Sequence, residues 1–505
     1  MPSGRPRTTV ERVSIRRAGA AGLLAFAVLA ACGDPAADTP PRAEPPAPAA
    51  AVPVPAPTIP AVTPGTDFAA VTHLVQDAVA ARRLPGAVVQ IGHAGDIVYR
   101  QAFGSRKLDG EPGLDGSPAP AEPMTEDTLF DLASLTKSLA TSTALLQLAE
   151  RGLVDIDDPV QHYLPAFNPT PDPRRARVTL RMLATHFSGI AGDLSLDGPW
   201  GLDRPAKEEG VRRALGAWVV FEPGTVFHYS DINFILIGAI IENLTGEPLD
   251  RYITERVFAP LGMADTHYLP VAKVCGPHRV RGAAVTLDGH APWTGRCPAG
   301  TWSTGLLARV APTALDEDTP DLNPDYGFPL RGTVHDPTAR RMGGVTGSAG
   351  VFSTVHDLGR FAQALLDRLA GRPSAFPLTR AGAATMTTPQ QPGHSPEQLV
   401  AANDAVRQDR RAGHAPSYPA IPGQDLRGLG WDIDTPHSRP RGTLFPVGSF
   451  GHTGFTGVTL WIDPGSDTYV VVLANVIHTR GGPPIAGLSG AVSTEAARAL
   501  GLYRN

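Results

Sequence analysis

The sequence predicts an α/β fold: a central antiparallel β-sheet built from both termini, with flanking helices and an inserted, mainly helical region. Near the start, GAVVQIGHAG and DIVYRQAFG are two β-rich runs around a Gly-Asp turn, which is typical of a hairpin. Near the end, GVTLWIDPGSDTYVVVLANV has the same pattern around a Pro-Gly turn. The middle is mainly helical in pattern and is punctuated by turns. Strands at both ends with helices between them favour a single sheet that both ends supply.

Each expected element has its own local signal. Apolar residues recur at helical spacing in 67–83 and in 131–152, where they include Leu132, Leu135, Leu139 and Leu146. The C-terminal hairpin is expected at 458–462 and 469–474, followed by a last helix over 487–501.

Two stretches have the composition of surface insertions. Residues 270–330 contain a cysteine pair and many prolines, and residues 388–425 are polar and loop-like.

The first 31 residues, 1–31, are predicted to be a lipoprotein-type signal peptide. Arg16 and Arg17 precede AGAAGLLAFAVLAAC, an apolar run too short to span a bilayer comfortably. Its end, Leu-Ala-Ala-Cys, resembles the lipobox of bacterial lipoproteins, which implies that Cys32 is lipidated and becomes the new N-terminus. Plain secretion after cleavage at a small-residue motif is the alternative. Gly33 favours outer-membrane sorting if the cell is Gram-negative.

Residues 32–65 are predicted to be a tether, because proline and alanine dominate them and cannot build a core. At about 3.1 Å per residue, such a segment reaches on the order of 100 Å from its anchor. The folded domain is then expected over 66–505, in the cell envelope and facing the periplasm or the exterior.

The charge balance restricts the partners. The chain has 44 basic and 49 acidic residues, a net charge of −5 with His neutral. Removal of 1–31 takes away five arginines and one glutamate, which leaves 39 basic and 48 acidic residues and a net charge of −9. This balance argues against a nucleic-acid partner. We expect a small-molecule or peptide substrate, and a membrane contact through the lipid on Cys32.

Two cysteines remain besides Cys32, namely Cys275 and Cys297. In an oxidising compartment the simplest interpretation is one disulfide, worth about 3 kcal/mol for a loop of this size. His278 and His290 lie nearby in the sequence, so a metal site is the alternative, although the four residues lack a tight zinc-ligand spacing. We expect no metal and no cofactor.

Lys137 is the most informative single residue. The chain has four lysines, Lys107, Lys137, Lys207 and Lys273, and uses arginine for its other basic side chains. Arginine does not give up its proton, whereas burial can lower the pKa of a lysine enough for it to act as a base. Lys137 is therefore a candidate for chemistry that arginine cannot do.

Ser134 stands three residues before Lys137, so a helix would place its hydroxyl within hydrogen-bond reach of the amine. If Asp131 or a neighbour caps that helix, Ser134 lies in the first turn, where the positive dipole end favours an anion and disfavours a protonated lysine. A serine needs such a base to become a nucleophile. S-x-x-K also occurs by chance, as a helix-start serine followed by a snorkelling lysine.

Two further segments add to this motif. FEPGTVFHYSDINFILIG contains Tyr229 and Asp231 just before an apolar helical run, and GSFGHTGFTG contains His452-Thr453-Gly454 just before the C-terminal hairpin. The ordered set S-x-x-K, then a variant of Y-x-N, then H-T-G resembles the serine β-lactamase and penicillin-binding-protein superfamily, in particular its class C-like esterase and peptidase branch. LATHFSGI, GGVTGSAGVFSTVHDLGRF and LRGLGWDI also look like that family, and the likeness spans about 66 to 503.

The resemblance implies a β-lactamase/transpeptidase-like fold and a set of roles. Ser134 would attack an acyl carbonyl, and Lys137 and Tyr229 would share the work of base and acid. The backbone N–H groups of Ser134 and Phe455 would form the oxyanion hole. Asp231 would orient Lys137, and Thr453, with Gly454, would line the substrate strand. A packed aromatic at a helix start is the alternative for Tyr229, and a polar strand residue is the alternative for His452.

Two departures from the family pattern bear on the substrate. Asp231 stands where the family often has asparagine, and His452 stands where β-lactamases usually have lysine. A neutral imidazole holds a substrate carboxylate less well than a lysine does. Both changes favour an esterase or a cell-wall peptide hydrolase over an efficient β-lactamase.

RGTVHDPTARRMGGVTG also resembles a stretch in family members linked to muropeptide handling. His335 and Asp336 are therefore candidates for the pocket rim, and a turn held by side-chain hydrogen bonds is the alternative.

The sequence thus predicts a serine hydrolase that acts through an acyl-enzyme on an ester, an amide or a D-amino-acid peptide bond. The alternative from another class is a catalytically silent protein that binds or senses peptidoglycan fragments on the same fold.

Overall fold

The computed structural model describes residues 66–282, 284–287, 292–479 and 484–503. The predicted signal peptide, the tether with Cys32, and His290 lie outside the described residues. Within the described ranges, no helix combines the length and the apolar composition needed to cross a membrane.

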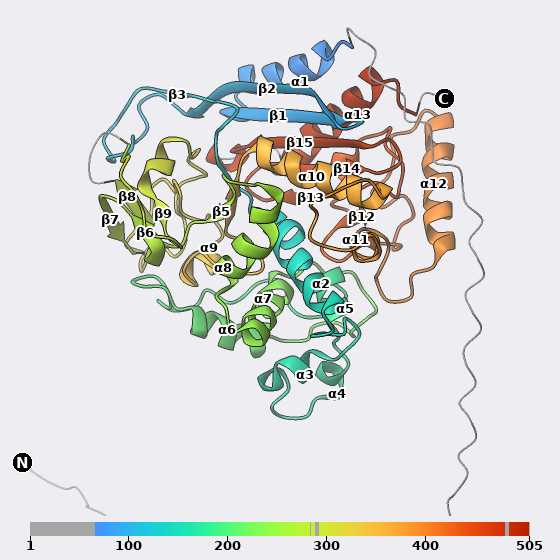
Figure 1. Ribbon diagram of the computed structural model, residues 1–505, viewed down its shortest axis with the longest axis horizontal. Coiled ribbons are helices and arrows are strands. Elements are labelled where there is room, and N and C mark those ends of the chain that lie inside the picture. The colour runs from blue at the N-terminus through green and yellow to red at the C-terminus, as the bar shows by residue number, and fades with distance from the viewer. Residues whose placement is uncertain (1–65, 283, 288–291, 480–483, 504–505) are drawn as a thin grey trace, which may run out of the picture. The chain divides into compact units, whose positions relative to one another are not determined.

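One antiparallel sheet of eight strands forms the centre of the domain, in the order β11-β12-β13-β14-β15-β1-β2-β3 (Figure 1). Strands β1 (Gly86–His93) and β2 (Asp96–Lys107) form the N-terminal hairpin, and β14 (Val458–Asp463) and β15 (Thr468–Ala474) form the C-terminal one. Strand β1 pairs with β15 from Ala87 opposite Ala474 to His93 opposite Thr468. The two ends of the domain therefore meet in the middle of one sheet, which confirms the predicted fold class.

The remaining strands extend the sheet on its two sides, β3 beyond β2 and the other three beyond β14. They are β3 (Glu122–Pro123), β11 (Leu426–Arg427), β12 (Asp432–Asp434) and β13 (Phe450–Gly454). Strand β13 carries the His-Thr-Gly motif and pairs with β14 from Phe450 opposite Ile462 to Gly454 opposite Val458.

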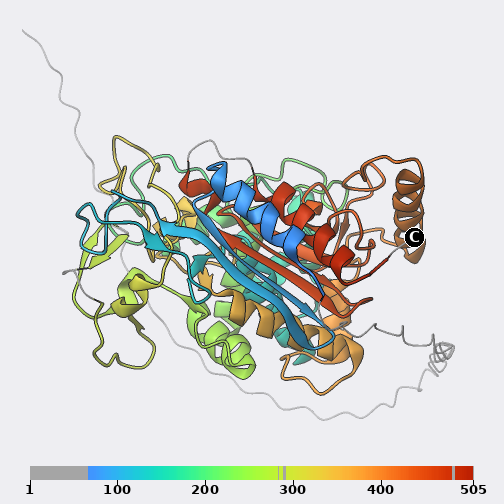
Figure 2. The same cartoon turned by 90° about the horizontal axis from the view of Figure 1, so that it is seen from above.

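Helices α1 (Ala69–Ala80) and α13 (Ile485–Ala499) lie side by side over one face of the sheet (Figure 2). Side chains alternate between the faces of a strand, so Val89 and Ile91 of β1 join the cluster under these helices while Val88 joins the cluster on the other side. Helix α10 (Val355–Ala370) covers that other face. Both faces are buried, which explains why β1 and β15 are apolar along almost their whole length.

The larger core cluster joins this face of the sheet to the inserted helical region, drawn below α10 in Figure 1. The helices of this region and of the following chain are a π-helix (Lys137–Ser142), α2 (Thr143–Glu150), α3 (Val160–Tyr163), α4 (Pro173–Ala176), α5 (Leu180–Thr185), α6 (Lys207–Leu215), α7 (Asp231–Thr245), α8 (Leu249–Ile253), α9 (Pro337–Arg341), α11 (Arg380–Thr387) and α12 (Pro396–Arg411). Leu135, Leu139 and Leu146, predicted as the apolar stripe of the first of these segments, are all buried.

The insertion at 270–330 has short strands and a small core of its own. Three strands, β4 (Phe130–Asp131), β10 (Val351–Ser353) and β5 (His267–Tyr268), form a second sheet next to it, and two pairs follow: β6 (Val274–Cys275) with β9 (Trp302–Ser303), and β7 (His278–Arg281) with β8 (Ala284–Leu287). Trp302, Leu307 and Val310 are buried in a third apolar cluster. Cys275 and Cys297 form a disulfide with a Cα–Cα distance of 5.8 Å, so neither offers a thiolate to a metal.

The prediction that 388–425 is loop-like was wrong for its central part. Residues Pro396–Arg411 form helix α12, which begins with a capping box between Ser395 and Gln398 and has proline in its first turn. Ala402 and Val406, four residues apart, are buried on one face of this helix. The apolar stripe is only these two residues wide, so the many polar residues of the segment concealed it.

Candidate active site

The turn that carries Ser134 is held by Asp131, which ends strand β4. The Asp131 carboxylate accepts hydrogen bonds from the N–H groups of Ala133 (2.9 Å) and His335 (2.7 Å). Asp131 therefore stabilises the turn from a strand instead of capping a helix. Ala133 adopts the left-handed conformation, with φ +44°, which is uncommon for a residue with a side chain and brings strain to the position before the serine.

Ser134 itself precedes the helix that begins at Leu135, and does not lie within its first turn. From Lys137 to Ser142 the helix is a π-helix before it continues as α2. π-Bulges of this kind occur often at functional sites.

Lys137 is fully buried, and three oxygen atoms surround its Nζ. Nζ donates to Ser134 Oγ at 2.9 Å and to the carbonyl oxygen of Ser348 at 2.9 Å, and it lies 2.5 Å from Asp231 Oδ1. The prediction that Lys137 has a lowered pKa was wrong: burial acts to lower its pKa, but the charge of Asp231, with Tyr229, outweighs burial and raises it. Lys137 is an ammonium in the resting protein.

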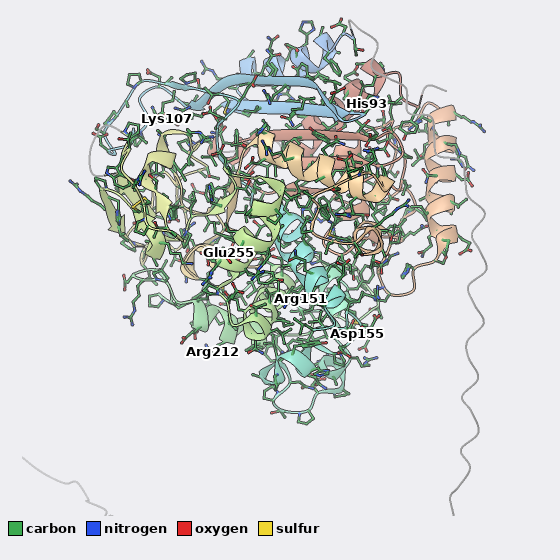
Figure 3. All side chains as sticks on the ribbon, in the orientation of Figure 1. His93, Lys107, Arg151, Asp155, Arg212 and Glu255 are labelled. Atoms are coloured by element: carbon green, nitrogen blue, oxygen red, sulfur yellow. A yellow bond between two sulfur atoms is a disulfide. The ribbon has the colours of Figure 1, made fainter. Side chains whose placement is uncertain are left out.

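Lys107 shows what distinguishes this environment. Lys107 is also fully buried, at the end of β2 (Figure 3), and its Nζ donates to the carbonyl oxygens of Leu108, Glu111 and Ala119. Three backbone carbonyls make that lysine a structural cation. Lys137 instead touches a hydroxyl and a carboxylate, which are groups that can exchange protons.

Tyr229 and Asp231 are placed by the start of α7. Ser230 is the N-cap, and its N–H donates to Nδ1 of His186 at 3.1 Å. The ring of Tyr229 stacks on His186, with ring centres 4.3 Å apart, and its centre lies 5.2 Å from Lys137 Nζ. Burial raises the pKa of Tyr229 although Lys137 opposes this, so Tyr229 is a neutral phenol. Its Oη is buried and interacts with the side chains of Ser134 and Lys137.

His452 lies on the other side of Tyr229, with ring centres 6.0 Å apart. Burial, together with Arg427 and Lys137 and against the effect of Asp432, lowers the pKa of His452 to about 3. Its Nδ1 lies 2.7 Å from the carbonyl oxygen of Thr453, and its Nε2 lies 3.9 Å from Asp432 Oδ2. The imidazole is therefore neutral at pH 7, as the sequence analysis assumed.

Behind His452, Arg427 and Asp432 form an ion pair that is fully buried. Burial by itself would raise the pKa of Asp432, but Arg427 holds it at about 2. The pair is nearly neutral as a unit, so it does not replace the missing lysine charge at the pocket surface.

Gly454 and Phe455 connect this strand to the serine turn. A Cβ at Gly454 would stand 2.4 Å from a methyl group of Val458 and 2.6 Å from the carbonyl oxygen of Leu132, so glycine is required for β13 to approach the turn. Phe455 follows with 74% of its surface exposed, and its ring stacks on that of His335 at 5.8 Å. The backbone N–H groups of Ser134 and Phe455 thus belong to two segments in direct contact.

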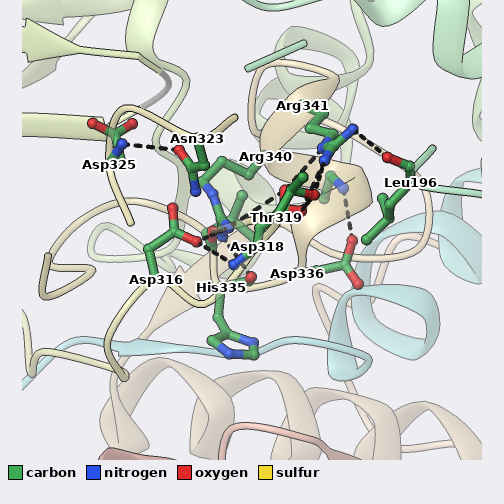
Figure 4. A network of polar contacts seen from close by, with 12 residues as sticks. Leu196, Asp316, Asp318, Thr319, Asn323, Asp325, His335, Asp336, Arg340 and Arg341 are labelled. Atoms are coloured by element: carbon green, nitrogen blue, oxygen red, sulfur yellow. Dashed lines mark hydrogen bonds and ion pairs between the residues drawn. The ribbon is translucent and has the colours of Figure 1, made fainter. Parts of the chain in front are cut away.

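His335 and Asp336 lie next to a buried network of arginines and aspartates (Figure 4). Arg340 donates to the carbonyl oxygen of His335 at 2.6 Å and pairs with Asp316 at 2.6 Å. Asp336 caps α9 by accepting from the N–H of Ala339 at 2.6 Å. Burial and the charge of Asp231 raise the pKa of Asp336 to about 7, so this carboxyl also faces the Lys137–Asp231 pair.

The site contains three residues that no sequence motif had assigned a role. Ser348 supplies a carbonyl to Lys137, His186 supports Tyr229, and Asp193 lies beside Asp231, whose charge, after burial, raises the pKa of Asp193. His186 and Ser348 stand in the flanking stretches LATHFSGI and GGVTGSAGVFSTVHDLGRF, which were noted only as similar to the family. Asp193 carried no signal.

Comparisons with known proteins identify the family of this chain. The family model described as Beta-lactamase matches residues 71–484. A protein of Escherichia coli (strain K12) named "Putative D-alanyl-D-alanine carboxypeptidase" is 30% identical over 397 residues, which are 76% of this chain and 76% of that protein. A protein of Escherichia coli O157:H7 with the same name is 29% identical over 409 residues, 78% of this chain and 79% of that one.

Solved structures show the same fold at low sequence identity. A class C beta lactamase from Rhodobacter sphaeroides is similar with a TM-score of 0.52 and 23% identity, over 85% of this chain and 99% of that one. An octameric penicillin-binding protein homologue from Pyrococcus abyssi is similar with a TM-score of 0.55 and 22% identity, over 86% of this chain and 78% of that one. The family model covers most of the domain and the ordered motifs lie within it, so the chain belongs to the β-lactamase family of serine hydrolases.

Proposed function

We propose that this chain hydrolyses an acyl bond through a covalent intermediate on Ser134. The observation that carries the proposal is the contact of 2.9 Å between Lys137 Nζ and Ser134 Oγ, with the Tyr229 hydroxyl interacting with both side chains. A nucleophile within hydrogen-bond reach of a buried base group, which a third residue orients, is the geometry of covalent acyl transfer.

In the proposed reaction Ser134 Oγ attacks the carbonyl carbon, and its proton passes to Lys137, which gives up one of its own because it is an ammonium in the resting protein. The N–H groups of Ser134 and Phe455 donate to the oxyanion that forms. Tyr229 Oη then gives its proton to the leaving group, and later takes a proton from the water that hydrolyses the acyl-enzyme. Thr453 and Gly454 line the strand along which the substrate lies.

The substrate class we propose is a D-amino-acid peptide bond, with related amides and esters as further substrates. The curated relatives at 29–30% identity are named as D-alanyl-D-alanine carboxypeptidases, which supports the peptide over the ester. The neutral imidazole of His452 attracts a free carboxylate less than the usual lysine would, which supports weak turnover of β-lactams and, by the same argument, weaker binding of peptides that end in a free carboxylate. A role in cell-wall peptide metabolism follows from this substrate.

We further propose that the domain works in the cell envelope, held by a lipid on Cys32 through the 32–65 tether. The apolar run before Cys32 and the proline-rich composition after it support this location. Metabolic labelling with a lipid analogue, compared between the wild type and Cys32→Ser, tests it.

A silent binding or sensor protein is the second candidate, and one observation favours it. The three N–H groups of the Lys137 ammonium face three acceptors, so the amine has no lone pair free for Ser134 in the resting state. Tight binding of a muropeptide without turnover of any substrate would support this candidate.

One experiment separates the two. Purified wild type and Ser134→Ala are compared on a short-chain p-nitrophenyl ester, a chromogenic cephalosporin and a peptide ending in D-Ala-D-Ala, and Ser134 is tested for labelling by a fluorophosphonate. We expect labelling and turnover that the variant abolishes. An unlabelled wild type, with the same hydrolysis in both proteins, would refute the covalent mechanism.

A further inference from the structure

The resting state of Lys137 raises a question about the acylation step. An ammonium has three N–H donors and no lone pair. Nζ of Lys137 donates to Ser134 Oγ and to the carbonyl oxygen of Ser348, and it forms an ion pair with Asp231 Oδ1. Lys137 can accept the proton of Ser134 only if it first loses one, or loses one at the same time. The proton must go to a group that already touches Nζ.

Two of the three neighbours cannot take it. The carbonyl oxygen of Ser348 is an amide oxygen and a very weak base, and Ser134 Oγ is the source of the incoming proton. Bulk water does not reach Nζ, since Lys137 is fully buried. Tyr229, which also contacts Lys137, is a neutral phenol that supplies the proton of the leaving group. Asp231 Oδ1, at 2.5 Å, is the remaining neighbour.

We propose that Asp231 is a catalytic base: it takes a proton from Lys137 as Lys137 takes the proton of Ser134. This inference rests on the proposed acyl-enzyme function and gives Asp231 more than the orienting role that its place in the Tyr-Ser-Asp motif implies. Asparagine, which the family often has at this position, could orient the amine but has no basic oxygen.

Transfer inside this pair is favoured by its surroundings. It converts an ammonium and a carboxylate into two neutral groups. When water is removed, neutral groups lose less solvation free energy than ions do. The Asp231 side chain is 19% exposed in the free protein whereas that of Lys137 is fully buried. A bound substrate that covers Asp231 would therefore shift the pair towards its neutral form.

Other ionisable groups face the pair from several elements. On the Asp231 side are two carboxyls, Asp193 and Asp336, whose pKa values the charge of Asp231, after burial, raises. A proton on Asp231 removes a negative charge that faces both, which stabilises the neutral pair. The groups that face Lys137 and its neighbours from the other elements are Tyr229, His186, His452, His437, Arg427 and, beside Asp193, His228.

The protons balance over the acylation step. The Oγ–H bond of Ser134 breaks as the Oγ–C bond to the substrate forms, one proton moves from Oγ to Nζ, and one moves from Nζ to Asp231 Oδ1. Tyr229 gives its proton to the leaving nitrogen or oxygen as the C–N or C–O bond breaks. In deacylation the Tyr229 phenolate takes a proton from the attacking water as the new C–O bond forms. The proton on Asp231 returns through Lys137 to Ser134 Oγ as the Oγ–C bond breaks, which restores the starting state.

The test is Asp231→Asn, because asparagine keeps size and hydrogen bonding and removes the basic oxygen. The rate of Ser134 labelling by a fluorophosphonate is measured from pH 6 to 10 for wild type and variant. We expect the variant to be about 100-fold slower or more at pH 7, the usual contribution of a proton-transfer group. Its rate should then rise about tenfold per pH unit, because only molecules in which Lys137 is already neutral can react, and their fraction rises with pH.

Two further variants sharpen the result. Asp250→Asn removes the carboxylate of another lysine–aspartate contact, that with Lys273 outside the site, and should label at the wild-type rate. Asp231→Glu keeps a carboxylate and should label faster than Asp231→Asn. Thermal melting checks that each variant is folded.

A charge-tuning role would give the opposite result. Without the carboxylate the pKa of Lys137 falls, so labelling of Asp231→Asn at pH 7 would equal or exceed the wild type, and the inference would be wrong. If Asp231→Asn labels slowly at a rate that does not change with pH, Asp231 only orients Lys137 and the inference is wrong. Equal labelling rates for the Asn and Glu variants would lead to the same conclusion. Absence of labelling in the wild type would instead refute the proposed function itself.

Discussion

Gly454 and Leu132 lie so close that a Cβ at Gly454 would stand 2.6 Å from the Leu132 carbonyl oxygen. Strand β13 can line the serine turn only because this position has no side chain. Gly454→Ala should therefore displace β13 from Ser134, lower kcat/KM at least about tenfold and destabilise the fold by about 1–3 kcal/mol, the usual range for overpacking. Steady-state kinetics and a denaturant titration measure both.

Gly487→Ala is the matched control, because a Cβ there has open space and the residue lies inside helix α13. It should leave kcat/KM unchanged and stabilise the protein by up to about 1 kcal/mol. Equal effects of the two substitutions on activity would show that the close approach of β13 has no role in catalysis.

Lys137→Arg keeps the positive charge beside Asp231 but replaces the only amine in the site with a group that does not lose its proton. We expect labelling of Ser134 to slow by about 100- to 10,000-fold, the range for loss of a general base. Lys207→Arg, at a partly exposed contact with Glu242, serves as the control and should label normally. Wild-type turnover in Lys137→Arg would mean that Lys137 contributes only charge.

His452→Lys restores the lysine that β-lactamases usually have. His452 is neutral because burial lowers its pKa to about 3, whereas a lysine beside Asp432 would be charged. We expect kcat/KM for a chromogenic cephalosporin, which has a carboxylate, to rise about tenfold, the size of one charge-assisted contact. A neutral p-nitrophenyl ester is the control substrate; an equal change for both substrates would contradict carboxylate recognition at this position.

Asp336→Asn should change how stability depends on pH. Burial and the charge of Asp231 raise the pKa of Asp336 to about 7 in the folded protein, against about 3.9 in an unfolded chain. The folded state therefore binds more protons between about pH 4 and pH 7, and the free energy of unfolding falls as the pH rises through that window.

Asparagine at 336 can still cap α9 and cannot ionise. The variant should match the wild type at about pH 4 and exceed its stability at about pH 8 by on the order of 1–3 kcal/mol. Denaturant titrations at the two pH values measure the difference. If variant and wild type differ in free energy of unfolding by the same amount at both pH values, Asp336 does not titrate in this window.

The disulfide between Cys275 and Cys297 closes a loop with a sequence separation of 22. The free energy of unfolding of the double variant Cys275→Ser/Cys297→Ser should be about 3 kcal/mol lower than that of the oxidised wild type. Reduction of the wild type should lower its stability by a similar amount and leave the double variant unaffected. Two free thiols in the unreduced protein, counted with a thiol reagent under denaturing conditions, would disprove the pairing.

The elements that the sequence predicted well are those with a strong local signal. The two hairpins have β-rich runs around Gly-Asp and Pro-Gly turns, and the strands found at 86–93 and 468–474 match them closely. Helix α12 was missed because its buried stripe is only Ala402 and Val406 among polar neighbours, and its capping box around Ser395 was the signal to use.

The sequence by itself determined the two terminal hairpins and the nearness of Ser134 to Lys137, because each depends on residues close together in the chain. The order of the three motifs can be read directly from the sequence. The tertiary structure decided the chemistry of Lys137. Its pKa depends on the charge of Asp231, 94 positions further along the chain, and Asp231 in turn faces Asp193 and Asp336 from other loops. Coulomb energies depend on distance in space and on burial, neither of which a linear pattern specifies. The lysine therefore looked like a free base in the sequence and is a fully engaged ammonium in the fold.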